Sequence, residues 1–90
     1  MVPKKPFLSD EAIGDLDDIW AHIATDSIQS ADGFIGQLYR KCVKIAELEA
    51  VGRRRDELFT GLLSLAFKKY VIFFLRTNDR VEIVRIIQGS

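Results

Sequence analysis

Three consecutive arginines, Arg53, Arg54 and Arg55, are the first group in this sequence that could do chemistry. A guanidinium can bind a phosphate or a carboxylate through two parallel hydrogen bonds. The run therefore predicts a site for a phosphate or for an acidic partner. An equally good interpretation is that one or two of these arginines pair with Asp56, Glu57 or acidic helix residues and fix the local chain.

A fourth arginine, Arg85, stands inside an apolar run near the end of the chain. Alternation along a strand predicts that Val84 and Ile86 face the core, and that Ile83, Arg85 and Ile87 share the opposite, open face. A charge in the middle of a strand seldom serves packing. We expect either a binding role or a local salt bridge to explain Arg85.

The remaining reactive side chains are scattered. His22 has no serine or cysteine near it in sequence, which favours a surface histidine over a catalytic base. Cys42 lies on an apolar helical stripe, so we expect a buried and inert thiol. Asp15, Asp17 and Asp18 lie off the main helical stripe, and a solvated helix face explains them better than a metal site does. We expect neither a metal nor a cofactor.

Three apolar runs rich in β-branched and aromatic residues, at 62–67, 70–77 and 81–88, predict an antiparallel meander. Asn78 and Asp79 tolerate the left-handed conformation, which predicts a tight turn between the last two runs. Pro6–Leu8 could add an edge strand. Neither long run alternates cleanly between apolar and polar residues, so we expect both faces of the sheet to be at least partly covered.

Two helices should precede the meander. Ser9 and Ser27 are candidate N-caps, and the apolar residues after each follow helical spacing, with the second helix at about 28–49. The short loop between them predicts an antiparallel helical hairpin. We expect Trp20 to be buried between this hairpin and the sheet, near Phe34, Leu38 and Val84.

Length and composition favour one globular domain, residues 1–90, with 48% hydrophobic residues and a net charge of zero. The charge is unevenly divided, because residues 1–50 carry nine carboxylates against five cations and residues 51–90 carry four against eight. A dedicated nucleic-acid binder is usually basic overall. No apolar run is long enough for a membrane helix, the opening residues do not form a signal peptide, and a lone cysteine suits a reducing compartment.

The order helix, helix, arginine-rich linker and three-stranded meander resembles the ParE-type toxins of the ParE/RelE superfamily. The resemblance covers nearly the whole chain. It is carried by Leu8-Ser9-Asp10-Glu11-Ala12, Asp15-Leu16-Asp17-Asp18-Ile19-Trp20 with Ile23-Ala24, Ala31-Asp32 with Phe34-Ile35 and Leu38-Tyr39, Gly52 to Leu58, Gly61-Leu62, Tyr70 to Phe73, and Val81 to Gly89. It implies an α+β fold of order β-α-α-β-β-β, with an antiparallel sheet packed against a helical hairpin.

The resemblance also implies a function. The chain would be the toxin of a type II toxin–antitoxin system, a binding inhibitor of DNA gyrase rather than an enzyme, acting in the cytoplasm without direct sequence-specific nucleic-acid binding. A cognate ParD-like antitoxin would form a hetero-oligomer with it. We expect the antitoxin to bind an uncovered apolar face with acidic side chains near the arginines, at Arg53, Arg54, Arg55, Ile83, Arg85 and Ile87.

Two alternatives remain open. A RelE-like ribosome-dependent ribonuclease needs a general acid and a general base, yet the chain has Phe74-Leu75 where many members have Tyr-Arg, and Gln88 where many have histidine. Tyr70 is then the one proton-transfer group left to propose. The chain also stops at Ser90, several residues before most relatives do, which allows a degenerate member that only binds its antitoxin.

Overall fold

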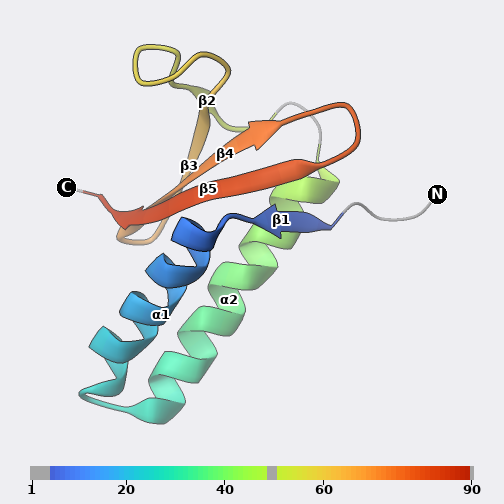
Figure 1. The fold of residues 1–90 in the computed structure, drawn as a ribbon. Coiled ribbons are helices and arrows are strands. Elements are labelled where there is room, and N and C mark those ends of the chain that lie inside the picture. The colour runs from blue at the N-terminus through green and yellow to red at the C-terminus, as the bar shows by residue number, and fades with distance from the viewer. Residues whose placement is uncertain (1–4, 49–50, 90) are drawn as a thin grey trace.

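The computed structural model describes residues 5–48 and 51–89, and its elements follow the predicted order (Figure 1). The elements are β1 (Pro6–Leu8), α1 (Asp10–Ala24), α2 (Ile28–Glu47), β2 (Arg53–Arg54), β3 (Leu63–Phe67), β4 (Tyr70–Arg76) and β5 (Val81–Gln88). The short strand β2 was not predicted. Glu49, the expected last residue of the second helix, lies outside the described residues. None of the described helices is long and apolar enough to cross a membrane.

Both helices begin at the predicted caps. The Ser9 hydroxyl accepts a hydrogen bond from the Ala12 amide at 3.0 Å, and the Ser27 hydroxyl accepts one from the Ser30 amide at 3.1 Å. These side chains satisfy amide groups that the first helical turn leaves without partners. The Ser9 hydroxyl also donates to the Val84 carbonyl at 2.7 Å, which fixes the start of α1 against β5.

The five strands form one sheet in the order β1-β5-β4-β3-β2, and both helices lie on the same side of it (Figure 1). β1 is a parallel edge strand on β5, and the other pairings are antiparallel. The α+β fold with a sheet on a helical hairpin is therefore confirmed. Gly52 lies directly against the core residue Phe74. It has a φ of 98°, and a Cβ at this position would lie 2.7 Å from the Phe74 ring, so only glycine fits there without strain.

A β-bulge in β5 changes which residues face the helices. Phe74 of β4 pairs with Ile83, while the adjacent Phe73 pairs with Arg85, so Val84 is an extra residue on β5. The extra residue shifts the alternation of inward and outward side chains. Ile83 is consequently 0% exposed in the core and Val84 is half-buried. The placement of Ile83 on the open face and of Val84 in the core was wrong.

Trp20 is also placed differently from the prediction. It is 37% exposed, and its indole nitrogen donates to Asp32 Oδ1 of α2 at 2.8 Å. The adjacent Ile19 is buried, at 6% exposure, because the face of α1 that packs against the core runs through Ala12 and Ile19, and Trp20 lies at the edge of that face. Among the described residues other than glycine, a positive φ occurs at Lys68 (55°) in the β3–β4 turn and not at Asn78 or Asp79.

Candidate functional site: the open face and the α2 groove

The side of the sheet away from the helices carries a row of apolar side chains. Residues paired across antiparallel strands point to the same face, and the pairs here are Val71 with Ile87 and Phe73 with Arg85. Leu75 lies on the same side by alternation along β4, and Ala66 of β3 pairs with Val71. We call this surface the open face, and it consists of Ala66, Val71, Phe73, Leu75, Arg85 and Ile87. Ile87 is 40% exposed.

Arg85 makes the local salt bridge that was one of its two predicted explanations. Its Nε and Nη2 donate to Asp15 Oδ2 and Oδ1 at 2.8 and 2.9 Å, and Asp15 Oδ2 also accepts from the Ile86 amide at 2.8 Å. The Asp15 side chain is only 11% exposed, so the prediction of a solvated carboxylate was wrong for this residue. Burial raises the pKa of Asp15, but the hydrogen bonds from Arg85 and Ile86 and the charge of Arg85 outweigh it and leave the pKa below its ordinary value.

The three consecutive arginines are divided between local ion pairs and the open face. Arg54 pairs with Asp56 at 2.8 Å and Arg55 with Glu57 at 3.0 Å. The Arg55 guanidinium also lies 6.0 Å from the centre of the Phe73 ring.

Phe73 therefore lies beside Arg55, and it also lies beside Arg85, with which it pairs in the sheet. Arg53 and Arg55 line a hollow of about 400 Å³ together with Ala66 and Val71. The structure thus brings Arg53, Arg55, Arg85 and Ile87 to one surface. Sequence reasoning missed Phe73, although alternation along 70–77 could have placed it there.

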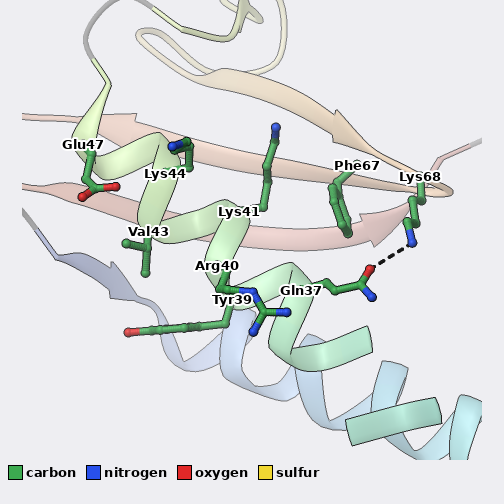
Figure 2. Close-up of a pocket in the computed structure, with 9 residues that line it drawn as sticks. All are labelled: Gln37, Tyr39, Arg40, Lys41, Val43, Lys44, Glu47, Phe67 and Lys68. Atoms are coloured by element: carbon green, nitrogen blue, oxygen red, sulfur yellow. Dashed lines mark hydrogen bonds between the residues drawn. The ribbon is translucent and has the colours of Figure 1, made fainter. Parts of the chain in front are cut away.

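A second surface, absent from the sequence predictions, lies on the other side of the sheet. We call it the α2 groove, a groove of about 610 Å³ between α2 and the end of β3 (Figure 2). It is lined by Gln37, Tyr39, Arg40, Lys41, Val43, Lys44, Glu47, Phe67 and Lys68. Figure 2 shows Lys68 reaching α2, where its ammonium donates to Gln37 Oε1 at 2.9 Å. Sequence reasoning placed positive charge on the sheet half and negative charge on the helical half, so it overlooked these cations on α2.

The groups that could transfer protons are not gathered on the open face. Tyr70 is partly buried on the helix-covered side, with its ring centre 5.6 Å from that of Phe34. His22 shares a hollow of about 300 Å³ with Tyr70 and Gln88 on that same side. Cys42 is fully buried, as predicted, and burial raises the pKa of its thiol to about 11. Within residues 5–48 and 51–89, no cluster of three metal-ligating side chains occurs.

Comparison with known proteins identifies the family to which this fold and sequence belong. The family model described as the ParE toxin of the type II toxin–antitoxin system parDE matches residues 7–90. The toxin ParE1 of Caulobacter vibrioides is 33% identical over 88 residues, which cover 96% of this chain and 91% of that protein. A chain in the structure of the chromosomal ParDE toxin–antitoxin system from P. aeruginosa has the same fold, with a TM-score of 0.81 at 19% identity and 98% of each chain covered. The chain therefore belongs to the ParE toxin family of type II toxin–antitoxin systems.

Proposed function

We propose that this chain inhibits DNA gyrase by direct binding and is neutralised by a cognate ParD-like antitoxin that covers the open face. The observation that carries the proposal is the row of apolar side chains on that face, where Ile87 is 40% exposed and Val71, Phe73 and Leu75 are partly exposed. Contiguous exposed apolar surface on a small protein is typical of an interaction site. A type II toxin requires such a partner, and the solved relative from P. aeruginosa is itself described as a ParDE system.

The arginines around the open face define the chemistry of the antitoxin segment. Ile87 and Phe73 would receive apolar anchors, and the guanidinium groups of Arg53, Arg54, Arg55 and Arg85 would meet acidic side chains at the rim. Because Arg54, Arg55 and Arg85 already pair with carboxylates of this chain, a partner would share or exchange those pairs. A segment that folds on binding could also extend the sheet at an edge.

Inhibition by contact, rather than by catalysis, suits the distribution of polar groups. Cleavage of RNA through its 2′-hydroxyl needs an acid, a base and a cation within hydrogen-bonding reach of one phosphate. Tyr70 and Arg85 lie on opposite faces of the sheet, which supports a binding role over a ribonuclease that uses these two residues together. Gyrase and an antitoxin of this kind are both cytoplasmic, so we expect this toxin to act in the cytoplasm.

Calorimetry with the protein encoded next to this toxin tests the antitoxin site. We expect Arg85→Ala and Ile87→Ser each to weaken the complex by at least tenfold, because Arg85→Ala would leave an acidic side chain of the antitoxin unpaired and Ile87→Ser would remove an apolar contact. Ile13→Ser is the matched control, since Ile13 is 48% exposed on the helical hairpin. Weakening by Ile13→Ser, with Arg85→Ala and Ile87→Ser unchanged, would move the antitoxin to the outer face of the hairpin.

The target is tested separately, with purified gyrase and with cells. We expect the toxin to inhibit supercoiling in vitro, and its induction to produce DNA breaks and a DNA-damage response without site-specific mRNA cleavage. The in vitro assay also distinguishes an active toxin from a degenerate member, which would bind the antitoxin and leave supercoiling unchanged. Specific mRNA cleavage that disappears in Arg85→Ala would instead establish the ribonuclease.

A further inference from the structure

The α2 groove differs in chemistry from the open face, on the opposite side of the sheet. Arg40, Lys41, Lys44 and Lys68 line it, and Glu47 is the one carboxylate among its described lining residues. None of these cations forms a salt bridge within residues 5–48 and 51–89, whereas Arg85 on the open face does. The groove is therefore an unneutralised cationic surface on a chain whose net charge is zero.

Three of the cations are placed by helical spacing. Arg40 and Lys44 are four residues apart on α2, and Lys41 and Lys44 are three apart, so all three project to one side of the helix. Like charges at these spacings repel one another and weaken a helix. An acidic ligand along α2 would relieve that repulsion.

The fourth cation is held at the end of the groove by the β3–β4 turn. Lys68 has a φ of 55°, a conformation that is unfavourable for a residue with a side chain. Its ammonium lies 5.7 Å from the ring centres of both Phe34 and Phe67 and donates to Gln37. These contacts hold the positive charge of Lys68 beside the rings of Phe34 and Phe67.

Apolar side chains complete the groove. Tyr39 is 44% exposed, and Val43 and Phe67 are partly exposed beside it. Figure 2 shows the lining residues spread along α2, with Phe67 pointing toward the helix from the end of β3. An apolar floor with a cationic rim along a helix favours an amphipathic helix with an acidic stripe, and the zero net charge of the chain disfavours nucleic acid.

We infer that the α2 groove binds an acidic amphipathic helix of the toxin's target, while the antitoxin occupies the open face. The inference rests on the proposed function, which makes gyrase the target and supplies two different partners. Two surfaces of unlike chemistry on opposite sides of one sheet suit two different partner segments. Unpaired cations also accelerate association with an acidic partner, in a manner that salt weakens.

The experiment compares supercoiling inhibition with antitoxin affinity in the same variants. Arg40→Glu/Lys41→Glu reverses two charges in the middle of the groove, and Lys5→Glu/Arg80→Glu makes the same charge change at two exposed positions away from it. We expect the groove variant to need at least tenfold more protein for half-maximal inhibition of gyrase, with the antitoxin Kd within twofold of wild type. The control variant should match wild type in both assays, and thermal unfolding should show that both variants are folded.

Arg40→Gln/Lys41→Gln, which only neutralises the charges, should give an intermediate loss and a weaker salt dependence of inhibition than wild type. If the groove variants inhibit gyrase as wild type does, the inference is wrong and the proposed function stands. If wild type itself does not inhibit gyrase, both are wrong. A fall in antitoxin affinity would assign the groove to the antitoxin, and a loss of binding to a DNA duplex without gyrase would assign it to nucleic acid; either result overturns the inference.

Discussion

Asp15 of α1 and Arg85 of β5 are 70 residues apart in sequence and share two hydrogen bonds of 2.8 and 2.9 Å. Asp15 also accepts the amide hydrogen of Ile86, which follows the bulge in β5. The pairing of β1 with β5 ends at Ile83. Beyond that point, Ser9 and Asp15 of the α1 segment bond to the backbone of β5 in place of a neighbouring strand.

Substitutions of Asp15 should show how much its hydrogen bond from the Ile86 amide and its ion pair with Arg85 each contribute to stability. Arg85 is 47% exposed, and exposed ion pairs contribute only about 0–1 kcal/mol. Asp15→Ala also leaves the Ile86 amide without its acceptor, so we expect a loss of about 1–3 kcal/mol in the free energy of unfolding. Asp15→Asn retains one acceptor oxygen and should lose less. Urea unfolding measures both, and equal losses would show that the Ile86 bond contributes nothing.

The lowered pKa of Asp15 predicts a dependence of stability on pH. Because the pKa in the folded state lies below its ordinary value of 3.8, the stabilisation is fully present above that value and is lost as the pH falls through the folded-state pKa. The stability difference between wild type and Asp15→Asn should be constant above about pH 5 and should shrink below about pH 4. Urea unfolding at a series of pH values measures this difference. A difference that stays constant down to pH 2 would contradict the assigned role of the Asp15 charge.

Cys42 should be unreactive while the protein is folded. Its side chain is fully buried, and burial raises the pKa of the thiol to about 11, so almost no thiolate is present at pH 8. We expect no labelling by a disulfide reagent at pH 8 in buffer and complete labelling in denaturant. Rapid labelling of the folded protein would show that the hairpin opens often enough to expose this thiol.

Much of this fold follows from local patterns. The caps Ser9 and Ser27 and the spacing of apolar residues place both helices, and the apolar runs place β3, β4 and β5. The face to which each strand residue points was harder to predict, because the extra residue at Val84 lies in a run that is apolar on both sides of it. Its signature is the spacing of Val81, Ile83 and Ile86, which can be interpreted only when the partner strand is known.

The same limit applies to the candidate site. The arginines at 53–55 and Arg85 could be proposed from their type and position, but their partners Asp15, Asp56 and Glu57 depend on the folded chain. The α2 groove combines cations on α2 with Phe67 and Lys68, about 25 residues away in sequence. No pattern within either segment indicates that the two will meet.

Trp20 should contribute less to stability than a fully buried tryptophan. It is 37% exposed and donates to an exposed carboxylate, so Trp20→Phe should cost about 0.5–1.5 kcal/mol, the net value of one hydrogen bond. Leu38→Ala is the control in the facing helix, since Leu38 is 0% exposed and should lose about 2–5 kcal/mol. If Trp20→Phe destabilises as much as Leu38→Ala, the indole is packed more tightly than its exposure indicates.

Ile83 and Ile87 provide the sharpest test of the bulge, because simple alternation would place both on the open face. Ile83 is 0% exposed and Ile87 is 40% exposed. Truncating a buried isoleucine to alanine removes its burial and leaves a cavity, so Ile83→Ala should cost about 2–5 kcal/mol. Ile87→Ala should change the free energy of unfolding by less than about 1 kcal/mol and should still weaken the antitoxin complex. Urea unfolding and calorimetry on the two variants measure both effects, and equal destabilisation by the two substitutions would mean that β5 alternates without a bulge.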